Sequence, residues 1–249
     1  MLNDILLNIL FNTKQELEKT LNLTDEEIEK EALAYFKRNK KRLISTFLDN
    51  KLDTKRVYLS IGASGAGKSE FITSLNKEES LNIIDTDEII KLFPYYSGQN
   101  TDLFQKVSIK TVEYLIDNSF KKNLSFILNT DIVNFNVANK NIIRALNRDY
   151  KVEIFYIFRE YQNCKDMIKK REEKDGKTVN NVVFDENAIG SLDTFTQLFQ
   201  EYRDNKNINL TIIDLENDTI FLKREPLKME TILKSYRTQL DDYLKKIEL

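Results

Sequence analysis

The chain has 249 residues, of which 41% are hydrophobic, enough to bury the core of one α/β domain with an appendage or of two small domains. Its 38 basic residues nearly balance its 40 acidic ones, so the overall charge gives no reason to expect long nucleic acid or an anionic membrane as a partner. The chain lacks histidine, which excludes imidazole metal sites and histidine-based triads, so a general base must be a carboxylate or a perturbed lysine.

The N-terminal region, residues 1–52, is predicted to be a helical segment. Residues 1–11 are apolar but carry Asp4, lack a basic leader and a cleavage site, and are too short to span a bilayer. A helix is expected to begin at Thr24, because Glu27 stands three residues later, which is the spacing of a capping box. Its apolar residues recur at helical spacing: Ile28, Ala32, Tyr35 and Phe36.

From residue 57 onward, short apolar runs alternate with helical patterns. The runs cover 57–61, 81–85, 124–129, 151–158 and 208–215. Continuous apolar runs of this length are typical of strands buried on both faces in a parallel sheet. The expected helices follow Lys68 and Asp87, cover 104–120, 137–147 and 161–173, and end with a helix from Pro226 to Leu249. The predicted fold is an α/β three-layer sandwich with a mostly parallel five- or six-stranded sheet, divided into 1–52, 53–225 and a C-terminal helix, 226–249.

Three of the six glycines lie within the stretch GASGAGKS, residues 62–69, directly after an apolar run and before a helical pattern. This stretch fits G-x-x-x-x-G-K-[ST], the P-loop, in the strand-loop-helix context that the motif requires. Glycine allows successive backbone N–H groups to curl around a phosphate, at the positive end of a helix. The predicted nucleotide-binding residues are Gly62, Ala63, Ser64, Gly65, Ala66, Gly67, Lys68 and Ser69. Lys68 would bridge the β- and γ-phosphates of ATP or GTP, and the Ser69 hydroxyl would bind Mg²⁺.

The class of P-loop protein is narrowed by motifs that the sequence lacks. A GTPase needs an Asn-Lys-x-Asp motif to read the base, and neither "NKEE" nor "NKNI" has the aspartate. Motor and AAA-type ATPases are larger chains. A small phosphotransferase that uses ATP and Mg²⁺ remains as the favoured class.

Two carboxylates follow the second apolar run. Asp85 and Asp87 would lie at the carboxyl edge of the sheet, where ligands bind in open α/β folds. Alternation along the strand sends Asp85 and Asp87 to the same side, so that one could hold a water of Mg²⁺ while the other accepts a proton from a substrate hydroxyl. In the alternative, Asp85 caps the following helix and only Asp87 faces the substrate.

The motifs "GASGAGKSE", "IIDTDEIIKLFPYYSGQN", "VEYLID", "FILNTDIVNFNVANKNIIRAL" and "KKREEKDGKTV" occur in the order and spacing of the zeta toxins. Between about Val57 and Asp214 the chain resembles this family, the P-loop kinases of bacterial toxin-antitoxin systems. The resemblance implies a fold like that of nucleotide kinases and transfer of the ATP γ-phosphate to the 3′-hydroxyl of the amino sugar in UDP-N-acetylglucosamine. It also implies that Asp87 is the general base.

The same resemblance suggests further site residues. Glu113 matches a glutamate that helps to bind the amino sugar in the family; in the alternative, it is simply an exposed glutamate on a helix. Arg171 matches an arginine that binds the phosphates in the transition state. Lys177 stands where the family usually has a second arginine on a lid, so it keeps the charge and loses the bidentate fork. Thr130 and Asp131, after the third strand, are assigned to substrate binding.

Two positions depart from the family pattern. Ser64 replaces a usual proline in the loop, a change that a hydroxyl tolerates. Asn129 stands at the end of the third strand, where an acidic residue is common, and cannot act as a metal-polarising carboxylate, although Asp131 could compensate. The departure at Asn129 implies changed substrate recognition or weakened activity.

Alternatives to a sugar-nucleotide kinase therefore stay open. The acceptor could instead be a nucleotide, a nucleic-acid end or a dinucleotide, and a catalytically weakened ATP-binding regulatory protein is a further possibility. A separate antitoxin could block the ATP site, or the N-terminal helices could do so in cis, although packing against the sheet is favoured because their apolar stripe needs a partner. The single cysteine, Cys164, fits a reducing compartment, so the protein is expected in the cytoplasm and not at a membrane.

Overall fold

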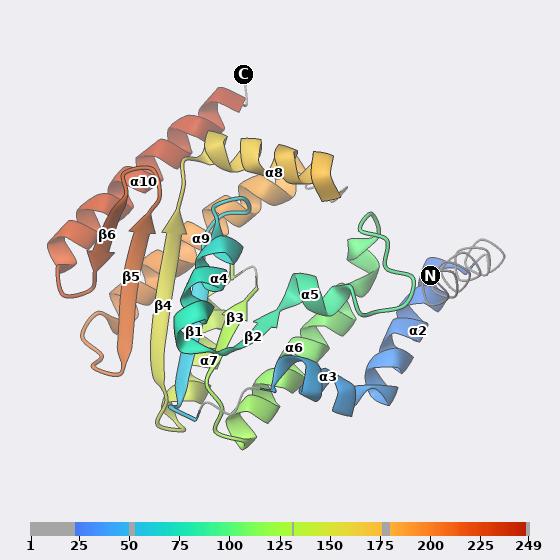
Figure 1. Ribbon diagram of the computed structural model, residues 1–249. Coiled ribbons are helices and arrows are strands. Elements are labelled where there is room, and N and C mark those ends of the chain that lie inside the picture. Colours follow the sequence, from blue (N-terminus) through green and yellow to red (C-terminus); the bar gives the residue numbers. More distant parts are fainter. Residues whose placement is uncertain (1–22, 50–52, 131, 176–179, 248–249) are drawn as a thin grey trace.

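A six-stranded sheet forms the centre of the computed structural model, which describes residues 23–49, 53–130, 132–175 and 180–247 (Figure 1). The strands are β1 Arg56–Ile61, β2 Asn82–Asp85, β3 Phe126–Asn129, β4 Lys151–Phe158, β5 Ile208–Asp214 and β6 Thr219–Leu222. Their order across the sheet is β2-β3-β1-β4-β5-β6, and only the last pair, β5 with β6, is antiparallel. The predicted mostly parallel sheet is confirmed.

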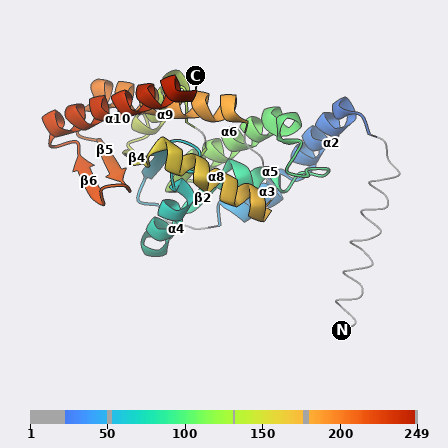
Figure 2. The same ribbon diagram turned by 90° about the horizontal axis from the view of Figure 1, so that it is seen from above.

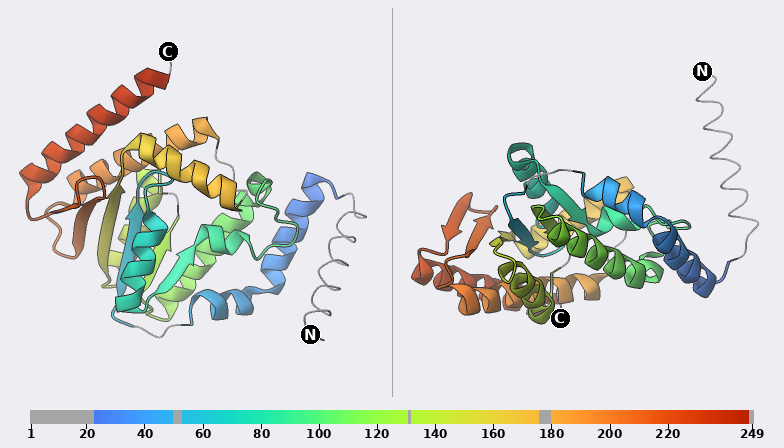
Figure 3. Two further views of the ribbon diagram at one scale, coloured as in Figure 1. Left: turned by 45° about the horizontal axis from the view of Figure 1, so that its top comes forward. Right: turned by 90° about the horizontal axis from the view of Figure 1, so that it is seen from below.

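Helices cover both faces of this sheet, which explains why the central strands are almost continuously apolar. One face carries α4 Lys68–Glu79, and the other carries α6 Gln105–Lys121, α7 Phe135–Leu146, α9 Asn181–Tyr202 and α10 Pro226–Ile247, while α3 Lys40–Phe47 packs against α6 and β2. Views along the sheet show these three layers (Figures 2 and 3). In β1, every residue from Val57 to Ile61 is buried, as expected for a strand between two helical layers.

The remaining helices lie around the edges of the sheet. The short helix α5 Thr86–Ile90 follows β2, and the 3₁₀ helix Thr101–Phe104 leads into α6. Helix α8 Tyr161–Asp175 crosses above the carboxyl ends of the strands (Figure 1). Among the described helices, none combines the length and the apolar character that a bilayer span requires.

Helix α2 Asp25–Arg38 begins as predicted, with a complete capping box. The Thr24 backbone N–H donates to Glu27 Oε2 at 2.8 Å, and the Glu27 N–H donates to Thr24 Oγ1 at 3.3 Å. The Phe36 ring packs edge-on against Tyr114 of α6, with the centroids 5.7 Å apart, and Ala32 is fully buried. Helices α2 and α3 therefore pack against α6 at the β2 side of the sheet, away from α4, in two perpendicular views (Figures 1 and 2). Residues 1–11 lie outside the described residues.

The last helix begins at Pro226 as predicted and is fastened to the sheet by Tyr236. The Tyr236 ring stacks on Phe158 at a centroid distance of 3.5 Å, and its hydroxyl donates to Asp214 Oδ2 at 2.6 Å. Asp214 is buried at the end of β5 and also accepts from the N–H groups of Glu216 and Asn217. This network joins the helix to the turn between β5 and β6.

Among the described strands and α-helices, two have no counterpart among the sequence predictions: helix α9 and strand β6. The residues of α9 mix apolar and small polar side chains, but the side chains buried on it include Phe184, Ala188, Leu192, Phe195 and Phe199, which recur at helical spacing. Strand β6 has only four residues and none of them is buried, so it lacks the apolar signal that revealed the parallel strands.

Candidate active site

The P-loop links β1 to α4 at the carboxyl edge of the sheet. Gly65 and Gly67 have φ values of 80° and 103°, which L side chains rarely adopt. A Cβ at Gly62 would lie 2.5 Å from the carbonyl oxygen of Ile157, and a Cβ at Gly65 would lie 2.4 Å from that of Cys164. The glycines are therefore required both by backbone conformation and by the close approach of β4 and α8.

The Lys68 side chain folds back over this loop. Its Nζ donates to the carbonyl oxygens of Gly62 at 2.7 Å and Ala63 at 3.2 Å. Ser69 follows in the first turn of α4 and is exposed. An ammonium group and a hydroxyl thus stand at the positive end of an α-helix, which is an arrangement suited to phosphate.

Asn187 is a contact of the loop that the sequence analysis missed. This residue of α9 is only 7% exposed, and its Oδ1 accepts from the Ser64 backbone N–H at 2.8 Å and from Ser64 Oγ at 3.3 Å. The missed signal was a polar residue on the buried face of a helix, which requires that the helix itself be recognised.

The placement of Asp85 and Asp87 corrects the strand-alternation prediction. Strand β2 ends at Asp85, and Asp87 lies in the first turn of α5, so the two carboxylates do not alternate along one strand. Asp85 is the N-cap of α5, and its Oδ1 accepts from the N–H groups of Asp87 at 2.8 Å and Glu88 at 3.2 Å. Both residues still lie at the carboxyl end of β2, with Asp85 half-buried and Asp87 exposed.

Asn129 connects Asp85 to the central strand. The Asn129 Nδ2 donates to Asp85 Oδ2 at 2.5 Å, and its Oδ1 accepts from the Ser60 hydroxyl at 3.3 Å. A hydrogen-bonded chain therefore runs from β1 through β3 to β2. Burial raises the pKa of the Asp85 carboxyl above its usual value, although the hydrogen bonds from Asn129 and from the Glu88 and Asp87 N–H groups act in the opposite direction.

Arg171 approaches the P-loop from α8. Its Nη2 donates to Glu70 Oε1 at 2.8 Å, and Glu70 lies in the first turn of α4, next to Ser69. Partial burial alone would raise the pKa of Glu70, but hydrogen bonds from its own N–H and from Arg171 lower it below the usual value. Arg159, directly after β4, donates from Nε to the Ala66 carbonyl oxygen at 3.4 Å. Two guanidinium groups thus stand beside the loop.

Cys164, in the first turn of α8, is fully buried beside the loop. Its carbonyl oxygen faces Gly65, and its thiol lies 3.5 Å from the carbonyl oxygen of Arg159. Burial raises the pKa of the Cys164 thiol to about 12, so the thiolate is not populated at neutral pH.

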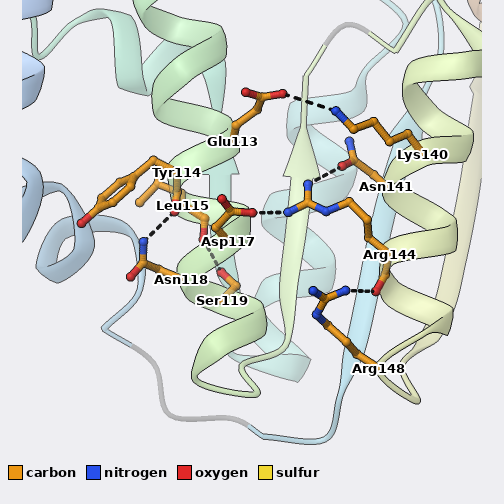
Figure 4. Close-up of polar contacts among 10 residues, drawn as sticks. All are labelled: Glu113, Tyr114, Leu115, Asp117, Asn118, Ser119, Lys140, Asn141, Arg144 and Arg148. Atoms are coloured by element: carbon orange, nitrogen blue, oxygen red, sulfur yellow. Dashed lines mark hydrogen bonds and ion pairs between the residues drawn. The ribbon is translucent and has the colours of Figure 1, made fainter.

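Glu113 lies apart from these groups, on the surface between α6 and α7 (Figure 4). Its side chain is 57% exposed, with Oε1 3.9 Å from Lys140 Nζ, and one turn further Asp117 pairs with Arg144. The two ion pairs form a ladder between the two helices. The contacts of Glu113 are those of the exposed helix glutamate that the sequence analysis kept as the alternative.

Thr130, the first residue after β3, is half-buried beside Asn129 at the same sheet edge. Asp131 and Lys177 lie outside the described residues. The structure therefore brings the P-loop, Asp85, Asp87, Thr130 and Arg171 to one region of the molecule.

The residues present fit a magnesium ion that arrives with a nucleotide. The Ser69 hydroxyl and the Asp85 carboxylate offer the oxygen ligands that Mg²⁺ prefers. Within the part of the chain that the structure describes, no group of three or more Asp, Glu, His or Cys residues could hold a metal ion. Since Mg²⁺ is commonly bound by one or two protein oxygens together with substrate phosphates, such a cage is not needed.

Comparison with known proteins supports this picture. Residues 24–225 match the sequence model of the family described as Zeta toxin. The fold is similar to that of the PezAT chromosomal toxin-antitoxin system of Streptococcus pneumoniae, with a TM-score of 0.63 and 16% identity over 83% of this chain and 96% of the other. It is also similar to AvrRxo1-ORF1:-ORF2 with ATP, with a TM-score of 0.55 and 10% identity over 79% of this chain and 65% of the other. No curated protein sequence gives a significant match.

Proposed function

Because the chain belongs to the zeta toxin family, we propose that it is an ATP-dependent kinase that phosphorylates a hydroxyl of a sugar nucleotide and acts as a toxin. The acceptor proposed is the 3′-hydroxyl of UDP-N-acetylglucosamine. The observation that carries the proposal is the meeting of a P-loop with an acidic helix start, Asp85 to Asp87, at one edge of the sheet. Phosphoryl transfer needs these two parts: a cradle for the triphosphate and a base for the acceptor.

On the nucleotide side, the loop N–H groups and Lys68 bind the phosphates. Lys68 would exchange its two loop carbonyl oxygens, 2.7 and 3.2 Å away, for β- and γ-phosphate oxygens. Ser69 and Asp85 would hold Mg²⁺, which neutralises charge on the phosphates when it is bound. The start of α4 adds its own positive potential.

On the acceptor side, Asp87 takes the proton of the attacking hydroxyl. The hydroxyl oxygen then bonds to the γ-phosphorus as the bond to ADP breaks. Asp85 fixes the N–H of Asp87, which holds the base at the start of α5. Thr130 and Asp131 are proposed to contact the acceptor, together with Glu113 if the acceptor reaches α6.

Arg171 is proposed to stabilise the transferring phosphoryl group. Its present partner, Glu70, adjoins Ser69, so a small side-chain movement on α8 would bring the guanidinium to the γ-phosphate. Lys177, six residues further along the chain, is proposed to add a second positive charge.

Turnover assays test this function directly. The full chain is incubated with ATP, Mg²⁺ and, in separate reactions, UDP-N-acetylglucosamine, nucleotides, a dinucleotide and oligonucleotides, while ADP release is followed. We expect release only with the sugar nucleotide and a loss of at least about 100-fold in Asp87→Asn, because a positioned general base contributes about 10²–10⁴-fold. Glu88→Gln removes the neighbouring exposed carboxylate, which pairs with Lys91, and should retain activity.

Other outcomes distinguish the alternatives. If ADP is released with a different acceptor, the proposed kinase mechanism stands and the proposed acceptor, the sugar nucleotide, is wrong. Tight ATP binding without turnover for any acceptor would favour the regulatory protein, with Asn129 as the reason for lost catalysis.

An antitoxin is the proposed protein partner. The PezAT neighbour is a toxin-antitoxin system, and the fold of this chain covers 96% of its aligned chain. Helices α2 and α3 pack against α6, so we propose that residues 1–52 form a packing segment of the kinase, followed by the kinase domain, 53–225, and the C-terminal helix, 226–249. A truncation lacking residues 1–52 should then be insoluble rather than more active.

A further inference from the structure

Helix α9 and the P-loop are joined by one buried polar contact. Asn187 Oδ1 accepts two hydrogen bonds from a single residue, Ser64, at 2.8 Å from the backbone N and 3.3 Å from Oγ. Asn187 is 7% exposed and stands among apolar neighbours on its helix, including Phe184 and Ala188. A polar side chain in such a place is retained only if its hydrogen bonds repay the loss of water.

The bond reaches the part of the loop that is least supported by its own backbone. The second half of the loop runs into α4, whose helical bonds hold it, and the Ala66 N–H donates to the Ala63 carbonyl oxygen at 3.1 Å. The Ser64 N–H instead donates to a side chain 123 residues away. If Asn187 were absent, this donor would have to turn toward water or toward another acceptor, and the loop would turn with it.

We propose that Asn187 is a positioning residue for ATP binding, holding the Ser64 peptide so that the neighbouring loop N–H groups are already aimed at the phosphates. The inference rests on the proposed ATP-binding function of the loop. A preorganised loop loses less conformational entropy when the nucleotide binds, so removal of the anchor weakens affinity without touching any group that contacts the ligand.

The test is a double-mutant cycle on ATP affinity, measured by calorimetry on the full chain. Asn187→Ala leaves the Ser64 N–H without its acceptor, and we expect the Kd for ATP to rise about ten-fold, or ~1.4 kcal/mol. Ser64→Pro removes the N–H itself, and Ser64 is not among the residues with positive φ, so proline is compatible in that respect. In the Ser64→Pro background, Asn187→Ala should change the Kd less than about two-fold, because the interaction no longer exists to be lost.

Two control variants isolate the backbone donor. Ser64→Ala keeps the N–H and removes only Oγ, so Asn187→Ala should still weaken ATP binding in that background. Ser191→Ala removes another buried polar side chain one turn along α9, whose hydroxyl donates within the helix to Ala188, and should leave the Kd unchanged.

A nucleotide-free readout separates this inference from the proposed function. Amide hydrogen exchange at Ser64 should be slow in the wild type and faster in Asn187→Ala. If the wild type fails to bind ATP, the proposed function is wrong, whereas the exchange result still reports on the anchor. Asn187 would be only structural if Asn187→Ala lowers the melting temperature but leaves the Kd for ATP unchanged. The inference would also be overturned if Asn187→Ala raises the Kd for ATP as much in the Ser64→Pro background as in the wild type.

Discussion

Among the individual residues, Asn129 shows how one amide changes the chemistry of a carboxylate beside it. It donates to Asp85 and accepts from Ser60, so both ends of the amide are used. An aspartate at this position could accept from Ser60, but it could form a hydrogen bond with Asp85 only if one of the two carboxyls were protonated and acted as the donor. The Asn129 hydrogen bond therefore lowers the pKa of Asp85 against the larger effect of burial, and so favours the ionised carboxylate that caps α5.

We expect Asn129→Asp to make the stability of the metal-free protein fall as pH rises. Burial and the adjacent Asp85 would raise the folded-state pKa of the new carboxyl above its unfolded value near 3.9. Its contribution is then fully present below that unfolded value and is lost as pH rises through the folded pKa, by about 1.4 kcal/mol for each unit of the rise. Urea denaturation at pH 4 and pH 8, with the wild type measured in parallel, checks this. An equal difference at both pH values would contradict it.

Which residues could be predicted from the sequence depended on whether their role is local. Gly62, Lys68 and Ser69 act within one contiguous motif, so spacing alone revealed them. The assignment of Asp85 and Asp87 to one side of a strand was wrong because the strand ends at Asp85, where the predicted apolar run also ended, and Asp87 lies in the helix that follows. Asn187 could not be found, because its partner Ser64 lies 123 positions away.

Among the elements, the loop between β1 and α4 is shaped as much by its neighbours as by its own sequence. Gly65 combines a φ of 80° with a position where a Cβ would lie 2.4 Å from the Cys164 carbonyl oxygen. The start of α8 thus forms a wall against the loop. A motif in the sequence indicates the glycine, but only the packing of α8 explains why this glycine has no room for a methyl group.

Gly65→Ala should be much more destabilising than Gly98→Ala. Gly98 has a similar φ of 85° but nothing within 4 Å of the position that a methyl group would take, so its substitution adds only backbone strain of about 1–2 kcal/mol. Gly65→Ala adds steric overlap with backbone atoms, which costs typically a further ~1–3 kcal/mol. Chemical denaturation gives the free energy of unfolding of both variants. Equal decreases in this free energy would mean that α8 moves away from the loop at no measurable energetic cost.

Most elements could be predicted because apolar periodicity is local, and the failures have physical causes. Strand β4 matches its predicted range, 151–158, since its apolar run is buried between helices. Helix α9 was missed, although Asn180 caps it, because small polar residues such as Ser191 and Thr194 fill buried positions and obscure the apolar pattern. Strand β6 depends on pairing with β5, a non-local interaction.

In the molecule as a whole, the P-loop emerges from the middle of the sheet. Strand β1 is flanked by β3 and β4, while α2 and α3 lie beyond β2 and the β6 edge contacts α10. The three-layer arrangement was predicted from the alternation of apolar runs and helices, but the side of the sheet on which each helix packs was not. Because the loop is attached to the central strand of a large core, a ligand that binds the folded loop is expected to stabilise the entire fold against unfolding.

ATP with Mg²⁺ should therefore raise the melting temperature of the protein. At a free concentration 100 times the Kd, binding stabilises the native state by ~2.7 kcal/mol, which corresponds to a shift of roughly 5–10 °C for a chain of this size. Lys68→Ala should abolish most of the shift, whereas Lys77→Ala, an exposed lysine in the last turn of the same helix, should retain it. An undiminished shift in Lys68→Ala would contradict binding at the P-loop. Thermal unfolding monitored by circular dichroism provides the measurement.

The burial of Cys164 gives the chain an internal reporter. It is the only thiol in the sequence, it is fully buried, and its backbone touches the turn at Gly65. A thiol reagent can modify it only when α8 and the turn separate, so the labelling rate counts those openings. Saturating nucleotide should slow the labelling of Cys164. An unchanged labelling rate would show that α8 separates from the P-loop whether or not nucleotide is bound there.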